Sequence, residues 1–231
     1  GYILELLIIR HLYRRDHMDQ VLATFGLILF FNEAIRIGFG PAALFSDFPP
    51  SLTGFVFILP EAPYPVYRLL VIAIGILCAI AIHLFVSRTK VGAMVRAGAS
   101  NPKMAASLGI NIQLLFRFIF AAGATFAGLA GMMIGPLTSV EPGMGEPLLI
   151  LSLVVIIIGG IGSVRGAFIA AILIGLVDTM GRVTLPIILR AFFDGPTADT
   201  AGPALASMSV YILMAIVLVF RPTGLFPQKG N

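Results

Sequence analysis

The sequence predicts an all-α membrane protein, a polytopic transmembrane helical bundle of about six spans that forms a single domain over residues 1–231. Its composition supports this fold class: 58% of the residues are hydrophobic, 11% are charged, and the mean hydropathy is +1.02. Soluble domains contain about 45–50% apolar and about 25% charged residues. The 15 Lys and Arg and 11 Asp and Glu residues are too few to surround an apolar interior of this size. We therefore expect lipid to cover much of the surface.

Long apolar runs place the individual spans. The hydrocarbon core of a bilayer is about 30 Å thick, and a helix needs about 20 residues to cross it. Five runs meet or approach this length: 21–40, 66–86, 114–135, 167–183 and 205–220. A sixth run, 148–162, is short for a crossing, so an oblique span and a broken, re-entrant segment both remain open.

The distribution of charge predicts the orientation of the bundle. If all six runs cross, eleven basic residues share one face: Arg10, Arg14, Arg15, Arg88, Lys90, Arg96, Lys103, Arg117, Arg165, Arg221 and Lys229. The other face carries four, Arg36, Arg68, Arg182 and Arg190, together with Asp47, Glu61, Glu141, Glu146, Asp194 and Asp199. Cytoplasmic connections carry an excess of Lys and Arg, so the first face is assigned to the cytoplasm. If 148–162 does not cross, Arg165, Arg221 and Lys229 change sides.

Three shorter features complete the outline of the chain. Residues 52–59, LTGFVFIL, are aromatic and β-branched and predict a short strand or hairpin arm. The basic segment 10–17, RHLYRRDH, predicts an interfacial helix that contacts lipid headgroups. The single Cys78 excludes an intrachain disulfide. Because the chain begins with Gly1 rather than Met, we expect it to lack its native N-terminus.

The segment 100–110, SNPKMAASLGI, predicts a polar helix of about two turns between long apolar runs. Asn101 can cap its start, and Pro102 suits the first helical position. Gly109 can adopt the left-handed conformation that closes a helix. Met104 and Leu108 are four residues apart and form one apolar stripe. Both a surface helix resting on headgroups and a rigid knob offered to a cytoplasmic partner fit this pattern.

Four stretches of the chain resemble one family of membrane proteins. The first, VGAMVRAGASNPKMAASLGI, resembles the cytoplasmic loop of the permease subunits of branched-chain amino acid ABC importers, in particular the LivH-type subunit. The stretches AGATFAGLAGMMIGP, VVIIIGGIGSVRGAFIAAILIGLVD and VFRPTGLF match the second half of that family in order and spacing. The chain departs from the family by lacking additional N-terminal helices. The EAA loop of other ABC importers is recognisable only as Ala105, Ala106 and Gly109.

The resemblance implies a permease subunit in the bacterial inner (plasma) membrane that forms the translocation path for branched-chain or related amino acids. It implies four kinds of partner: the lipid bilayer, a homologous second permease subunit, two cytoplasmic ATPase subunits and a periplasmic substrate-binding protein. The sequence has no GxxxxGK[ST] motif, so ATP and Mg²⁺ would be bound by the ATPase subunits, and this chain would be no enzyme and carry no cofactor or metal. Nucleic acid is not an expected partner.

The resemblance implies that residues 88–112 form the coupling loop that contacts the ATPase. The coupling helix itself would comprise Asn101, Pro102, Lys103, Met104, Ala105, Ala106, Ser107, Leu108 and Gly109.

Two groups of residues are candidates for the translocation path. Asn32, Glu33 and Arg36 lie within one apolar run, where charged groups are costly and usually face a bundle interior or a cavity. They offer an acceptor for an ammonium and a donor for a carboxylate, but the pattern favours a self-neutralising pair near the outer interface. Glycines in the run GGIGSVRG, namely Gly159, Gly160 and Gly162, either break a helix beside the path or form a tight turn.

Other small or polar residues have mainly structural interpretations. Gly123, Ala127 and Gly131 are spaced by four residues and favour close helix packing, with a sliding gate surface as the alternative. Asp178 and Arg182 are expected to form an i, i+4 ion pair. His83 has no second His or carboxylate nearby in its helix, so we interpret it as a satisfied buried or interfacial side chain.

The residues alone also allow a different class of transporter, an ion-coupled secondary transporter or channel that works without an ATPase. Glu33, Arg36, Asp178 and His83 would then be the coupling groups. The sequence leaves open whether the substrate is a leucine-like amino acid, another amino acid, an amide or urea, and whether the partner permease is a copy of this chain.

Overall fold

The computed structural model describes residues 1–13, 15–47, 49, 52–59, 62–160, 162–191 and 193–226. The chain forms two compact units, Gly1–Gly145 and Glu146–Asn231, and each is described by itself below. The single domain over 1–231 therefore stays a prediction. Three residues that contributed to the predicted charge asymmetry, Arg14, Glu61 and Lys229, lie outside the described residues.

The described part of the chain is mostly helical, which confirms the predicted fold class. Five helices are long and apolar enough to cross a membrane: Met18–Phe39, Val66–Arg88, Ile112–Leu137, Val164–Leu189 and Thr197–Phe220. They confirm the five predicted spans, and the last two extend well beyond the predicted ends, to residue 189 and back to residue 197. The sixth apolar helix, Gly145–Gly159, is shorter and stops before the predicted end at residue 162. Many large apolar side chains are exposed, among them Ile37, Phe39 and Phe220, as expected of a surface that meets lipid or other subunits.

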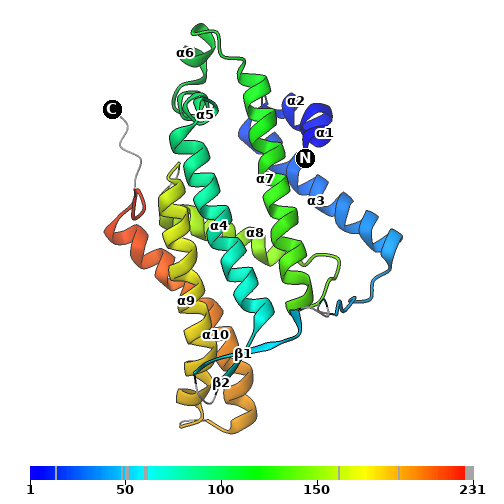
Figure 1. The fold of residues 1–231 in the computed structure, drawn as a ribbon, viewed down its shortest axis with the longest axis vertical. Helices are drawn as coiled ribbons and strands as arrows, with labels where there is room; N and C mark the ends of the chain where they lie inside the picture. The colour runs from blue at the N-terminus through cyan, green and yellow to red at the C-terminus, as the bar shows by residue number, and fades with distance from the viewer. Residues whose placement is uncertain are drawn as a thin grey trace. The chain divides into compact units, whose positions relative to one another are not determined.

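Unit 1 contains three long helices and several short elements (Figure 1). In chain order these are α1 (Tyr2–Leu4), the π-helical turn η1 (Glu5–Ile9), α2 (Arg10–Leu12), α3 (His17–Phe39), β1 (Phe55–Leu59), β2 (Ala62–Pro65), α4 (Val66–Arg88), α5 (Lys90–Ser100), α6 (Pro102–Ser107), α7 (Ile112–Ile134) and the 3₁₀ turn η3 (Gly135–Leu137).

The N-terminal helical segment of unit 1 packs against α7. The ring of Tyr13 lies edge-to-face against Phe116, with 5.6 Å between centroids, and the guanidinium of Arg117 lies 5.3 Å from the centre of the Tyr2 ring. Burial raises the pKa of the Tyr13 phenol above its usual value, and the negative charge of Glu5 raises it further. The predicted single helix over 10–17 is thus divided, since α2 ends at Leu12 and α3 begins at His17.

A β-hairpin and an isolated bridge lie at the opposite end of unit 1 from α5 and α6. Strand β1 pairs antiparallel with β2, with Phe55 opposite Pro65, and confirms the strand predicted in 52–59. Backbone hydrogen bonds of 2.9 Å in both directions join Leu44 to Val140. The segment that follows α3 is thereby fixed to the segment that follows α7.

Unit 2 is a three-helix assembly of α8 (Gly145–Gly159), α9 (Val164–Leu189) and α10 (Gly195–Phe220). Its core joins all three helices through Val154, Ile158, Ala170, Ile174 and Val210. Glycine allows α9 and α10 to approach closely, because a Cβ on Gly202 would lie 2.4 Å from Cγ of Pro186. Both α9 and α10 also contain an internal proline, Pro186 and Pro203, and each helix continues through it.

Candidate functional site

The short helix α6 has the two ends that the sequence predicts. At its start, the Asn101 side-chain oxygen accepts a hydrogen bond of 3.1 Å from the backbone N–H of Met104, and Pro102 occupies the first turn. At its end, Gly109 has φ +84°, and the N–H groups of Gly109 and Ile110 donate to the carbonyls of Ala106 and Ala105. This pair of bonds is a Schellman motif. Both ends of α6 are therefore satisfied without help from a neighbouring chain.

The two faces of α6 differ sharply in exposure. Ala105 is 2% exposed and faces the rest of unit 1, whereas Met104 is 65% and Leu108 76% exposed. A helix of six residues cannot gain much stability from an apolar stripe that remains in water. The exposed Met104 and Leu108 pair is thus suited to burial against another surface.

Sequence reasoning missed the helix α5, which holds α6 in place. The side chain of Thr89 accepts a hydrogen bond of 2.9 Å from the N–H of Gly92 and caps the start of α5. Gly92 has no room for a side chain, since a Cβ there would lie 2.3 Å from the carbonyl oxygen of Val86. The guanidinium of Arg96 donates to that same carbonyl. The threonine cap before KVGAMVRAGAS was the available signal for this helix.

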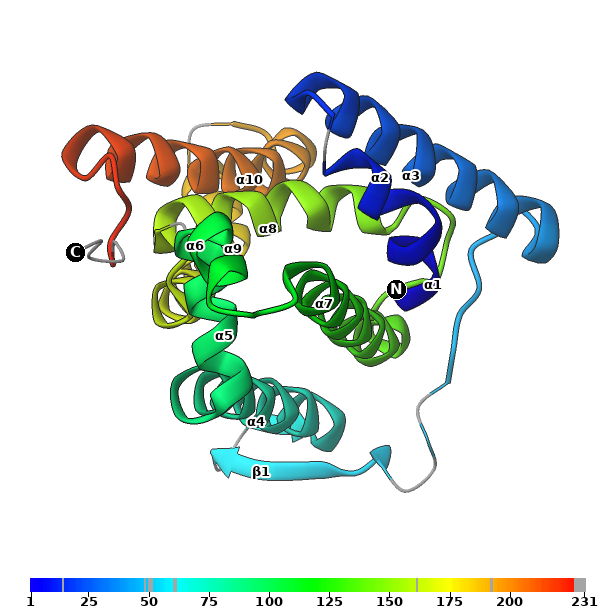
Figure 2. The ribbon, with the colours of Figure 1, turned by 90° about the horizontal axis from the view of Figure 1, so that it is seen from above.

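The helices α5 and α6 connect α4 with α7 (Figures 1 and 2). Besides the tight turn at Gly92, α5 lies so close to α7 that a Cβ on Gly98 would be 2.9 Å from a methyl carbon of Leu115. Leu115 is buried. A force applied to α6 therefore acts on two of the membrane-length helices through close-packed contacts.

The predicted polar group of α3 forms an ion pair. Nη1 of Arg36 lies 3.8 Å from Oε2 of Glu33, and both side chains are more than half exposed. Asn32 also has an interaction partner. This geometry is that of the self-neutralising pair, and the role of the three residues in a translocation path stays a prediction.

Gly159, Gly160 and Gly162 lie in a tight turn between α8 and α9. Gly159 packs against the backbone of Gly166, to which a Cβ would approach within 2.5 Å, and Gly160 and Gly162 have φ of +97° and +86°. The C-terminal segment RPTGLF returns to this turn: the N–H of Leu225 donates to Ile158 and that of Phe226 to Gly159. The two most distinctive stretches of the sequence thus meet in space. These backbone contacts favour the tight-turn interpretation over a break beside a path.

Gly123, Gly128 and Gly131 of α7 do not pack closely against another helix within the described part of unit 1. A Cβ on Gly123 or Gly128 would meet no atom within 4 Å, and one on Gly131 would meet only Met144, at 3.9 Å. Instead, Ala127, Gly128 and Gly131 line a cavity that also includes Asp47 and Tyr67. Sequence reasoning did not select Asp47 or Tyr67, because the cavity is formed by segments far apart in the chain.

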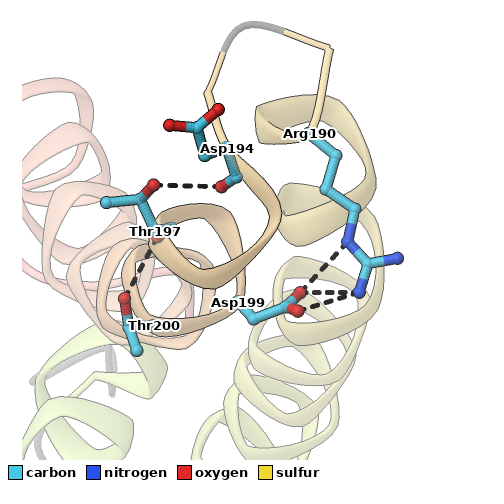
Figure 3. A network of polar contacts seen from close by, with 5 residues as sticks. All are labelled: Arg190, Asp194, Thr197, Asp199 and Thr200. Carbon is cyan, nitrogen blue, oxygen red and sulfur yellow. Dashed lines mark hydrogen bonds and ion pairs between the residues drawn. The ribbon is translucent and has the colours of Figure 1, made fainter.

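Polar contacts in unit 2 hold its helices together. Nε of Arg182 lies 2.9 Å from Oδ2 of Asp178, which confirms the predicted pair, and Nη2 of Arg182 donates to Ser207 on α10. Figure 3 shows a second group, in which Arg190 donates two hydrogen bonds through Nη2 and one through Nε to the carboxylate of Asp199. Both groups link α9 to α10, which indicates a structural role.

The length and composition of the five long helices indicate a multi-pass membrane protein. Residues 18–219 match the family described as branched-chain amino acid transport system, permease component. The chain therefore belongs to this family of permeases.

Individual relatives carry the same description. The chain is 27% identical over 230 residues to the high-affinity branched-chain amino acid transport system permease protein BraD of Pseudomonas aeruginosa, a match covering 97% of this chain and 69% of BraD. It is 27% identical over 150 residues to LivH of Escherichia coli, covering 64% of this chain and 44% of LivH. A probable LivH permease of Methanocaldococcus jannaschii is 28% identical over 137 residues, or 59% of this chain and 41% of the relative. No solved structure matches the chain.

Family membership confirms the resemblance seen in the sequence. The chain is a permease component of a branched-chain amino acid ABC transport system, and permease components are not themselves catalytic. The ion-coupled transporter or channel that the residues alone allowed is not supported by this membership.

Proposed function

We propose that this chain forms part of the translocation path of an ATP-driven importer for branched-chain or related amino acids. It would lie in the bacterial inner membrane beside a homologous second permease subunit. Two cytoplasmic ATPase subunits would bind ATP and Mg²⁺, and a periplasmic binding protein would deliver the substrate. The description of the family and the printed names of the relatives support the substrate class.

The proposed contact with the ATPase rests on the exposed apolar tip of α6, which consists of Met104 and Leu108. Met104 and Leu108 remain exposed, whereas both ends of α6 are capped by groups of this chain. Neighbouring apolar side chains exposed on a rigid element commonly mark a protein-interaction site, and Met is enriched at such interfaces. We assign Asn101 to Gly109 as the coupling helix that docks into an ATPase subunit, with Lys103 at its exposed rim.

The packing of α5 supplies a route for the motion. When the ATPase subunits close around ATP, α6 would move with them. Gly92, Arg96 and Gly98 tie α5 to α4 and α7, so these two helices would follow. Alternating access requires an element with two discrete positions, and both the ATPase subunits and the translocation path must shift the equilibrium between those positions. The candidate path beside Asn32, Glu33 and Arg36 belongs to the same proposal.

Copurification of the assembled transporter tests the docking surface. We expect Met104→Asp and Leu108→Asp together to release the ATPase subunits and to abolish ATP-dependent leucine uptake into proteoliposomes. Ala106→Asp is the matched control, because Ala106 is also exposed but lies on the other side of α6. Full ATPase retention and uptake by the double variant would overturn the docking assignment, and uptake that needs no ATP would overturn the proposed function.

A further inference from the structure

A cavity of about 660 Å³ lies within unit 1 and is lined by residues at the start of α4 and the end of α7. These ends of the two helices lie opposite α5 and α6 (Figure 1). Its wall comes from the segment that follows α3, the first turns of α4, the last turns of α7 and the segment that follows η3. Small-molecule sites in proteins commonly have volumes of roughly 300–1,000 Å³. The cavity is therefore large enough for an amino acid.

The wall of this cavity is almost entirely apolar. Leu52, Leu70, Met132 and Met144 contribute aliphatic and thioether surface. Methionine side chains adjust their shape readily and can accommodate differently branched groups. A wall of this kind selects an aliphatic group without specifying a single shape.

Among the described residues that line the cavity, Asp47 is the one with a charged side chain, and it is exposed. The Tyr67 hydroxyl, a second polar group of the wall, already donates a hydrogen bond of 2.9 Å to the carbonyl of Met133. The cavity thus combines a negative charge at its accessible side with apolar surface. A cation joined to an aliphatic group complements both features.

Glycines on α7 keep the cavity open. A Cβ built on Gly128 would meet no atom within 4 Å, so a larger side chain at this position would enter free space rather than strike the protein. Gly128 is therefore a position where a larger side chain can be placed beside the cavity without a clash at its Cβ.

We propose that this cavity binds the transported aliphatic amino acid, with the Asp47 carboxylate accepting hydrogen bonds from the substrate ammonium and the apolar wall holding its branched side chain. The substrate carboxylate faces water, away from Asp47. This site rests on the proposed function, since the orientation predicted from charge places the cavity on the outer side, where a binding protein would release its cargo. The ammonium and the side chain, rather than the carboxylate, then determine selectivity.

Binding of radiolabelled leucine to the purified transport complex, without the binding protein, tests this site. We expect Gly128→Leu to lower leucine affinity at least tenfold. Asp47→Asn removes a hydrogen bond to a charged group, which corresponds to a loss of about ten- to hundredfold. Gly75→Leu is the matched control, because Gly75 on α4 also has no atom within 4 Å and lies outside the cavity wall.

Two leucine analogues identify which group is recognised. Isopentylamine, which lacks the carboxylate, should compete with leucine for the unmodified complex and fail to compete in Asp47→Asn. The acid 4-methylpentanoate, which lacks the ammonium, should not compete.

The outcomes separate this site from the proposed function. Wild-type affinity in both Gly128→Leu and Asp47→Asn would overturn the site, as would competition by the acid but not by the amine. A complex that takes up leucine with ATP but binds none without the binding protein would also overturn the site and leave the function standing. A wild-type complex without ATP-dependent uptake would instead overturn the function.

Discussion

The carboxylate of Glu5 accepts a hydrogen bond of 2.9 Å from Nε of Arg117, although 112 positions separate the two residues. Glu5 is 0% exposed, and its second oxygen, Oε1, has no hydrogen-bond partner within the described part of the chain. Nη1 of Arg117 also donates to the Tyr2 hydroxyl. This pair fixes the N-terminal helical segment to α7.

Removing Arg117 alone should therefore destabilise the protein more than removing both partners. A buried ion pair that loses one member leaves an uncompensated charge, whereas replacing both members with apolar residues is often tolerated. We expect Arg117→Leu to lower the thermal unfolding midpoint strongly and Glu5→Leu combined with Arg117→Leu to recover most of that loss. Thermal melts of the detergent-solubilised protein measure this.

Arg190 and Asp199 provide the control pair, since both side chains are about half exposed. Exposed ion pairs contribute about 0–1 kcal/mol. Arg190→Leu should therefore shift the midpoint little. Equal shifts for Arg117→Leu and Arg190→Leu would contradict the structural role given to the buried pair.

The glycine turn between α8 and α9 should not tolerate even one methyl group. Gly160 has φ +97°, and a Cβ there would lie 2.9 Å from the carbonyl oxygen of Phe226. The left-handed conformation alone costs an L residue about 1–2 kcal/mol. We expect Gly160→Ala to reduce the yield of folded protein in gel filtration.

Gly175→Ala serves as its comparison, because Gly175 lies in α9 and a Cβ there would meet no atom within 4 Å. Alanine is favoured over glycine inside helices by about 1 kcal/mol. An unchanged or higher yield is expected for Gly175→Ala. If both variants behave alike, backbone crowding at Gly160 is unimportant.

The cap of α6 should affect coupling rather than assembly. Asn101→Ala removes the side-chain acceptor for the Met104 N–H and should destabilise the start of the helix by about 1 kcal/mol. Fraying at this end would loosen the transmission of force. We expect more ATP hydrolysed per leucine transported, measured in proteoliposomes. Asn101→Ser retains a capping oxygen and should keep the wild-type ratio.

The Tyr67 hydroxyl should stabilise the contact between α4 and the end of α7. Tyr67 is 4% exposed, and loss of its hydrogen bond to the Met133 carbonyl leaves that acceptor without this donor. Tyr67→Phe should lower the unfolding free energy by about 0.5–1.5 kcal/mol. Tyr211→Phe, at an exposed position of α10, should have no measurable effect. Chemical denaturation of both variants measures these changes in the unfolding free energy.

Local signals predicted local structure well. The order of Asn101, Pro102 and Gly109 predicted both ends of α6, because caps depend on residues within one helical turn. The spans were also found, since their apolar length is a property of consecutive residues. The ends of α9 and α10 were misplaced because the apolar runs end at residue 183 and begin at residue 205, whereas the helices continue through Pro186 and Pro203, where Gly202 packs against Pro186.

Features that depend on distant residues could not be predicted. The partner of Arg117 lies in a different helical segment, and nothing near Glu5 identifies it. Ala127 and Gly131 suggested helix packing, but they line a cavity together with Asp47, Tyr67 and Met144 from other elements. The sequence specified which residues are small or charged, and the fold decided what surrounds them.

The return of the C-terminal segment to α8 has a practical consequence for handling this protein. The N–H groups of Leu225 and Phe226 satisfy carbonyls at the end of α8, at distances of 2.8 and 3.2 Å. A fluorescent reporter or affinity tag fused close to Phe226 would break these two hydrogen bonds, so such fusions need a flexible Gly/Ser spacer.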